Sequence, residues 1–201
     1  MRPTGKFSSL TNGRHMQWES PNEKNAFIHL DFRYDVFAFR EQACEILYID
    51  DEGNEVVHYP DIDVVTMGGS EIWEVKPKKY ADHDWVKRRT DIMQAELAEL
   101  KIEYRMKHAE ELMREPQLST MNKILQFGRR PVGHDELATI RSVIASGDNL
   151  NWGAARKGAY GPYGREILCR LVLEGRLRVD SGSGLSERTE FVLGPRGVSH
   201  G

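Results

Sequence analysis

The amino-acid sequence predicts an α/β (α+β) fold, in which a mixed sheet flanked by helices is followed by a small helical C-terminal domain. Short runs of β-favouring residues alternate between apolar and polar side chains, as half-buried strands do. These runs span 36–39, 44–49, 55–65 and 71–76. Helical patterns lie on both sides of these runs, and the chain is mainly helical from Pro116 onward.

The beginning of the chain divides into an arm and a first helix. Residues 1–18 are polar and aperiodic, which predicts a flexible N-terminal arm. A helix begins next, because Ser20 can cap it, Pro21 suits the first helical position and Glu23 follows three residues after the cap. We expect this helix to end near Asp31.

A longer helix and one more strand complete the first domain, 19–115. The helix is expected over 84–100, where apolar residues that face the core recur at helical spacing. These residues are Val86, Ile92, Met93, Leu97 and Leu100. A strand at 102–107 and a helical turn at 109–113 follow, and Pro116 marks the linker to the second domain, 116–201.

The second domain combines three helical segments with two short strands. The helices are expected at 119–127, 134–145 and 162–174, and the strands at 176–179 and 190–193. Helices followed by a two-stranded ribbon are the outline of a winged helix. Its expected core consists of Ile167, Leu168, Leu171 and Leu177.

Composition limits the classes of protein that this chain can be. No apolar run approaches the roughly 18 residues of a membrane-spanning helix, and Met1–Ser9 lacks the apolar stretch of a secretory signal. We therefore expect a cytoplasmic protein without a membrane partner. The two cysteines, Cys44 and Cys169, are expected to stay reduced in that compartment.

Charge is unevenly distributed along the chain. The net charge is −3, which does not indicate a nucleic-acid-binding protein as a whole. Residues 1–115 carry 16 Lys and Arg against 23 Asp and Glu, whereas residues 116–201 carry 12 against 8. An acidic half that holds cations, joined to a basic half that meets a polyanion, is one interpretation of this difference, and chance is the other.

The residues with the chemistry of phosphodiester hydrolysis are Asp61, Glu74 and Lys76. Glu74 and Lys76 are two residues apart on one strand, so their side chains point to the same face. A hairpin places Asp61 on the neighbouring strand. Two carboxylates can hold a divalent cation that polarises a phosphoryl group, and an amine can position water or stabilise charge. The alternative is a surface hairpin with a weak Glu–Lys ion pair.

Glu23 has two interpretations. It can be the last member of a capping box with Ser20, or a further metal-binding carboxylate from the first helix. Local sequence favours the cap.

Four motifs between Glu19 and Pro77 resemble the nuclease domain of TnsA-type transposon endonucleases. A Glu precedes an aromatic residue by nine positions, and the other motifs are an Arg-Glu-Gln after a strand, a hairpin followed by Tyr-Pro-Asp, and a Glu-Val-Lys-Pro strand. In this sequence they are Glu23 with Phe32, Arg40-Glu41-Gln42, Tyr48–Gly53 with Tyr59-Pro60-Asp61, and Glu74-Val75-Lys76-Pro77. The likeness extends more weakly to about residue 130. Two positions depart from the family pattern, Ala43 and Ile62-Asp63, and Asp63 adds a carboxylate on the side of Asp61.

The resemblance implies a restriction-endonuclease-like core of the PD-(D/E)XK type with Mg²⁺ or Mn²⁺ as the cofactor. It implies an active site of Glu23, Asp61, Glu74 and Lys76, in which the three carboxylates bind the metal. The activity implied is cleavage of the non-transferred strand at the double-stranded ends of a transposon. The partners implied are an integrase-like transposase subunit and an ATPase regulator.

Several basic residues are candidates for contact with DNA. Lys78, Lys79, Lys87, Arg88 and Arg89 cluster after the Glu-Val-Lys strand, and a solvated helix face is the alternative interpretation. In the second domain Arg165, with neighbouring Arg and Lys residues, can contact DNA, border a docking surface for partner proteins, or form a solvated face. His29, His58 and His83 are expected to be surface or packing histidines.

Two rival functions remain open. One is a stand-alone restriction or defence nuclease of the same superfamily, which would cut plain DNA without partners. The other is a catalytically idle DNA-binding or assembly protein, which would bind no divalent metal.

Overall fold

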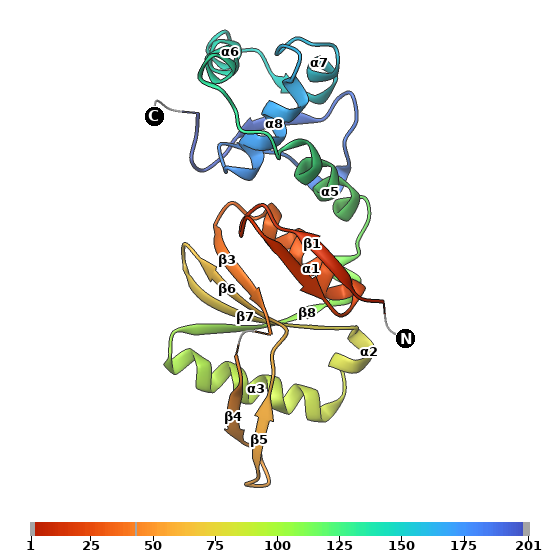
Figure 1. Cartoon of the computed structure of the whole chain (residues 1–201), viewed down its shortest axis with the longest axis vertical. Helices are drawn as coiled ribbons and strands as arrows, with labels where there is room; N and C mark the ends of the chain where they lie inside the picture. Colours follow the sequence, from red (N-terminus) through yellow and green to blue (C-terminus); the bar gives the residue numbers. More distant parts are fainter. Residues whose placement is uncertain (1–2, 43, 199–201) are drawn as a thin grey trace. The chain divides into compact units, whose positions relative to one another are not determined.

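A computed structural model describes residues 3–42 and 44–198 (Figure 1). The chain forms two compact units. The first comprises residues 1–30 and 35–114, and the second comprises residues 31–34 and 115–201. The predicted boundary at Pro116 therefore lies one residue from the observed one, and the chain is mixed α/β as predicted. Among the described residues, no helix is long and apolar enough to cross a membrane.

A four-stranded mixed sheet forms the centre of the first unit. Its strands, in spatial order, are β3 (Val36–Glu41), β6 (Ile62–Thr66), β7 (Gly69–Lys76) and β8 (Ile102–His108). Both β3 and β7 run antiparallel to β6, and β7 runs parallel to β8. The helices of this unit are α1 (Pro21–Phe32), α2 (Lys78–Ala81), α3 (Asp84–Glu99) and α4 (Ala109–Leu112).

The two faces of the sheet bury different helices. One face carries Trp73 and Val75 of β7, which pack with Ala26, Phe27 and Leu30 of α1. On the other face Ile72 of β7 and Tyr104 of β8 pack with Met93 and Leu97 of α3. Side chains of a strand alternate between faces, so Glu74 and Lys76 lie on the α3 face.

The helix α3 follows the predicted amphipathic pattern except at its end. Val86, Met93 and Leu97 are buried, and Ile92 is partly buried. Leu100 is 68% exposed because the helix ends at Glu99, so the prediction that Leu100 faces the core is wrong.

The predicted continuous strand over 55–65 is two strands in two sheets. β4 (Ile46–Ile49) and β5 (Glu55–His58) form a separate two-stranded ribbon, and β6 begins only at Ile62. Pro60 lies in the interruption, where it has no N–H to donate to a β-ladder. Residues Ile46 and Tyr48 of this ribbon pack against α3.

The N-terminal segment contains a hairpin that the prediction of a flexible arm missed. β1 (Gly5–Ser8) pairs antiparallel with β2 (His15–Trp18), and Met16 is fully buried in the α1 face of the core. The Asn12 amide exchanges two hydrogen bonds with the backbone of Phe39 in β3, at 3.0 and 3.2 Å. Each strand has only four residues, so the alternation was too short to identify from the sequence.

The second unit is a helical domain with a small sheet. Its helices are α5 (Gln117–Phe127), α6 (His134–Ala145), α7 (Trp152–Arg156) and α8 (Gly164–Leu173), and a short 3-10 turn spans Ser181–Ser183. Its strands β9 (Leu150–Asn151), β10 (Leu177–Arg178) and β11 (Glu190–Leu193) form an antiparallel sheet with β11 in the centre. The four predicted core residues, Ile167, Leu168, Leu171 and Leu177, are all buried.

Two elements of the second unit were not predicted, β9 and α7. Both are too short to show a periodic pattern, with two and five residues respectively. The local signal is the Asn151 cap, whose side chain accepts a hydrogen bond from the N–H of Ala154 at 2.8 Å.

Candidate active site

The hairpin of β6 and β7 brings Asp61 beside Glu74. Ile62 pairs with Trp73, so extending this register by one residue sets Asp61 opposite Glu74. Oδ2 of Asp61 accepts a hydrogen bond from the backbone N–H of Val75 at 2.6 Å. The side chain of Asp61 is therefore attached to β7 between Glu74 and Lys76.

Glu74 is a buried carboxylate between two cations. Its side chain is 2% exposed. Its Oε1 contacts Nζ of Lys76 and accepts a hydrogen bond from Nη2 of Arg89 at 2.9 Å. Its Oε2 is also buried and has no hydrogen-bond partner within the described part of the chain. The nearest nitrogen recorded for Oε2 is Nε2 of His58, at 3.5 Å. Paired cations make burial of this charge tolerable, and Oε2 keeps unused acceptor capacity.

Neutral polar groups line the far side of Glu74. Nε2 of His58 lies 3.1 Å from the hydroxyl of Tyr104 in a buried contact. Burial lowers the pKa of His58 to about 4, an effect that the Glu74 charge opposes, so this imidazole is neutral at pH 7. Burial also raises the pKa of Tyr104, which keeps its hydroxyl protonated. His58 is buried, which is one of the two environments that the sequence predicts for it. The sequence does not predict that it lies beside Glu74.

The charge of Glu74 opposes the ionisation of Asp61. Burial raises the pKa of Asp61 to about 7, and the charge of Glu74 raises it further, whereas the hydrogen bond from Val75 and the charge of Lys76 act in the opposite direction. A pKa this far from the ordinary value, caused by burial together with a specific charge, is typical of functional sites.

Glu23 takes part in a cap at the start of α1. Its backbone N–H donates to Oγ of Ser20 at 3.3 Å, and its carboxylate accepts hydrogen bonds from the N–H of Glu19 at 2.9 Å and from the Ser20 hydroxyl at 2.7 Å. The charge of Glu23 contributes to the raised pKa of Asp61, so the two carboxylates lie within electrostatic range. The cap is thus present, and Glu23 lies at the margin of the site that Asp61 and Glu74 form.

Asp63, the extra carboxylate near Asp61, is engaged elsewhere. Its Oδ2 lies 3.0 Å from a guanidinium nitrogen of Arg40 across the β3–β6 pair. The other departure from the family pattern, Ala43, lies outside the described residues.

The donor set of this site suits a magnesium-type cation. Within the residues that the structure describes, no group of three or more His, Cys, Asp and Glu side chains is arranged to hold a metal ion. Mg²⁺, however, is usually bound by one or two carboxylates, with waters and substrate phosphates as the other ligands. The carboxylates of Asp61 and Glu74 meet that requirement, and Oε2 of Glu74 has no hydrogen-bond partner among the described residues.

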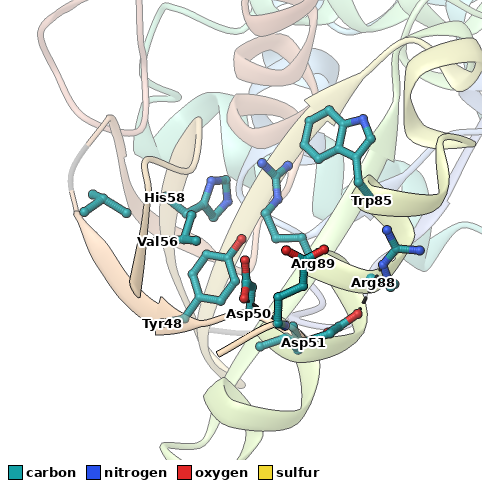
Figure 2. A pocket seen from close by; sticks show the side chains of 11 residues that line it. Tyr48, Asp50, Asp51, Val56, His58, Trp85, Arg88 and Arg89 are labelled. Atoms are coloured by element: carbon teal, nitrogen blue, oxygen red, sulfur yellow. Dashed lines mark hydrogen bonds and ion pairs between the residues drawn. The ribbon is translucent and has the colours of Figure 1, made fainter. Parts of the chain in front are cut away.

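A pocket of about 520 Å³ adjoins the site (Figure 2). His58 and Arg89, the two residues nearest Glu74 on this side, form part of its wall. Figure 2 shows the Trp85 indole beside the Arg89 guanidinium, which lies 5.4 Å from the ring centroid. Trp85 is 57% exposed. Arg88 of α3 forms an ion pair at 3.1 Å with Asp51, which lies at the tip of the β4–β5 ribbon.

The basic residues predicted to contact DNA have different environments. Lys78 and Lys79 are exposed on α2, immediately after β7, and Nζ of Lys79 lies 4.6 Å from the ring centroid of Tyr80. Lys87 is also exposed and lies 3.8 Å from Asp82. Arg89, by contrast, belongs to the site.

Arg165 of the second unit is only half-exposed. Its guanidinium lies 4.8 Å from the centroid of the Phe127 ring, between α8 and α5. Most of α8 is buried, and its other arginine, Arg170, forms an ion pair with Glu174 at 2.7 Å. The α8 helix therefore presents few free polar groups to an external ligand.

Comparison with known proteins gives no family. No protein-family model matches this chain, and no curated protein matches it.

The main group that the sequence analysis missed is Arg89. The sequence predicts for it only membership of a basic cluster that contacts DNA or forms a solvated helix face. The available signal was its spacing, because Arg89 follows Val86 by three residues and precedes Met93 by four, which places it on the core-facing stripe of α3. A cation on an apolar stripe indicates a buried partner, and that partner is Glu74.

Proposed function

We propose that this chain is a divalent-metal-dependent DNA endonuclease with a restriction-endonuclease-like core. The single observation that carries the proposal is the convergence of Asp61, Glu74 and Lys76 on one face of the β6–β7 hairpin, with Asp61 hydrogen-bonded to Val75. The element order α1, β3, β6, β7, α3 and β8 supports it, because a helix, a strand, a hairpin, a helix and a strand in this order are what the resemblance implies for such a core.

The cofactor in this proposal is Mg²⁺ or Mn²⁺, held by Asp61 and Glu74. When bound, such a cation supplies Lewis-acid polarisation of a phosphoryl group and acidifies water. The amine of Lys76 reaches the same carboxylate and is 26% exposed, so it can position water or stabilise charge on phosphate oxygens. Glu23 is a third carboxylate within electrostatic range of Asp61, and mutation can separate a metal-binding role of Glu23 from its role in the helix cap.

We further propose that the endonuclease cuts the non-transferred strand at transposon ends, as the TnsA-like subunit of a heteromeric transposase. The support is the set of motifs between Glu19 and Pro77. The partners are then an integrase-like transposase subunit and an ATPase regulator, and the protein is cytoplasmic. Lys78 and Lys79 follow the catalytic strand directly and are the proposed contacts to the DNA backbone.

The second unit is proposed to be a winged-helix domain that docks partner proteins. The order α6, β9, α7, α8, β10, β11 with a three-stranded sheet supports this architecture. A winged helix reads DNA through the helix that precedes the wing, which would be α8. That helix is largely buried and its arginines contact Phe127 and Glu174, which favours docking over base reading.

Plasmid nicking with matched variants tests the endonuclease. The Asp61→Asn variant removes the charge and retains an acceptor for the Val75 N–H. Asp63→Asn is the control, because Asp63 lies two residues away and is paired with Arg40. We expect the wild type and the control to nick the plasmid slowly in Mg²⁺ or Mn²⁺, and faster when the integrase-like transposase subunit is added. We expect no nicking by Asp61→Asn. Equal nicking by Asp61→Asn, or nicking in EDTA, would overturn the proposal, and fast cleavage of plain DNA without partners would favour the stand-alone nuclease.

A further inference from the structure

Two cationic side chains share one oxygen of Glu74, and they differ in how they are held. Lys76 lies on the same strand as Glu74 and its side chain is 26% exposed. Arg89 comes from α3, is 13% exposed, and donates to Oε1 from a position fixed by the packing of that helix on the sheet. Its Nε is buried without a hydrogen-bond partner among the described residues. The guanidinium is held by Glu74 and by a side-chain hydrogen bond to Tyr104.

We infer that Arg89 sets how tightly the site binds a divalent cation, because it competes with the cation for Glu74. This inference rests on the proposed function, since it assigns a role to Arg89 in the same site. A guanidinium does not lose its proton in proteins, so its charge is present at every working pH. A cation held by Asp61 and Glu74 lies close to that charge, and like charges in a partly buried site repel strongly.

The pocket beside the site gives Arg89 an alternative position. Arg89 lines this pocket of about 520 Å³ together with Trp85, whose exposed ring lies 5.4 Å from the guanidinium (Figure 2). A cation that binds Glu74 can therefore displace the guanidinium toward the pocket, and the cation–π contact that Arg89 already makes with the indole remains to hold it there. Arg89 then limits metal affinity without preventing metal binding.

A purely structural role of Arg89 predicts the opposite result. If Arg89 only orients the Glu74 carboxylate for its ligand, its removal leaves Glu74 misplaced and weakens metal binding. If Arg89 competes, its removal strengthens metal binding while the protein becomes less stable in EDTA, because a buried carboxylate has lost a partner. The sign of the change in affinity separates the two roles.

The experiment is a calorimetric titration of the full-length protein with MnCl₂. The variants are Arg89→Gln, which removes the charge, and Arg89→Lys, which retains it. Arg88→Gln is the matched control, because Arg88 is the next residue on α3 but pairs with Asp51 at the surface. We expect Arg89→Gln to bind Mn²⁺ at least about 10-fold more tightly than the wild type, with Arg89→Lys and Arg88→Gln within about 2-fold.

Thermal denaturation tests the same inference if Arg89→Gln is too marginally folded for calorimetric titration. We expect its midpoint to be below that of the wild type in EDTA and to rise more than the wild-type midpoint when MnCl₂ is added. Unchanged or weaker Mn²⁺ binding by Arg89→Gln, with wild-type binding that Asp61→Asn abolishes, overturns this inference and leaves the proposed function intact. Absence of Mn²⁺ binding in both wild type and Arg89→Gln overturns both.

Discussion

The backbone N–H of Val75 donates a 2.6 Å hydrogen bond to Oδ2 of Asp61. This bond attaches the segment before β6 to the C-terminal end of β7, between two residues whose side chains face the other way from Val75. Asp61 thereby stays beside Glu74 even though Pro60 ends the ladder on its N-terminal side. The hydrogen bond also lowers the pKa of Asp61, against the larger effects of burial and of the Glu74 charge.

The raised pKa of Asp61 predicts how stability depends on pH. The folded pKa of about 7 exceeds the ordinary value of 3.8, so the folded state binds more protons than the unfolded state between those values. This contribution therefore lowers the stability as pH rises from about 4 to about 7, and becomes constant above that.

Asp61→Asn isolates this contribution. The amide has no charge and can still accept a hydrogen bond from Val75. We therefore expect the melting temperature of Asp61→Asn minus that of the wild type, measured in EDTA, to increase by about 5 °C or more from pH 4 to pH 7. Asp63→Asn, measured in parallel, should show no such trend. A difference between Asp61→Asn and wild type that stays constant over this pH range contradicts the raised pKa.

Lys76→Met separates chemistry from metal binding. The substitution keeps much of the aliphatic stem and removes the amine, so cleavage should fall by about 100-fold or more. Binding of Mn²⁺ should persist, because the carboxylates of Asp61 and Glu74 remain. Single-turnover cleavage and Mn²⁺ titration measure the two effects, and cleavage at the wild-type rate would exclude a catalytic amine.

Glu23→Gln and Ser20→Ala separate the metal role of Glu23 from its cap. Glu23→Gln retains a side-chain acceptor but removes the charge near Asp61, so we expect near wild-type stability and cleavage reduced about 10-fold or more. Ser20→Ala removes the cap hydroxyl and should cost about 1 kcal/mol of unfolding free energy while leaving cleavage unchanged. Full activity in Glu23→Gln would restrict Glu23 to the capping box that it forms with Ser20.

DNA binding should depend on Lys78 and Lys79 and not on Arg165. The two lysines are exposed just after β7, so the double variant Lys78→Gln/Lys79→Gln should bind all duplexes more weakly and show a smaller salt dependence. Arg165→Gln should bind as wild type does, because its guanidinium lies against Phe127. Fluorescence anisotropy at several salt concentrations measures both, and a large effect of Arg165→Gln would instead indicate DNA contact through α8.

The strand pattern allowed the central geometry to be predicted from the sequence. Two-residue spacing places Glu74 and Lys76 on one face, and a tight hairpin brings Asp61 to the same place. Both depend only on local periodicity and on the turn at Met67 and Gly68. The core residues of the second unit were predicted for the same reason, since Ile167, Leu168 and Leu171 recur at helical spacing.

The surroundings of Glu74 could not be predicted in the same way. His58, Arg89 and Tyr104 come from three elements, β5, α3 and β8, that are separated by up to 46 residues. Their contacts depend on how α3 and the ribbon pack on the sheet, which no local pattern specifies. The N-terminal hairpin was missed because its stabilisation comes from a distant strand, through the hydrogen bonds between Asn12 and Phe39.

We propose that Asp61 and Glu74 jointly hold a divalent cation, and electron paramagnetic resonance of Mn²⁺ tests this claim. The full-length wild type, Asp61→Asn, Glu74→Gln and the control Asp63→Asn would be titrated with MnCl₂, with folding verified by circular dichroism. We predict one bound Mn²⁺ per chain in the wild type and in Asp63→Asn, and loss of that ion in both Asp61→Asn and Glu74→Gln. No bound Mn²⁺ in the wild type, or a bound ion that persists in both variants, would contradict the claim.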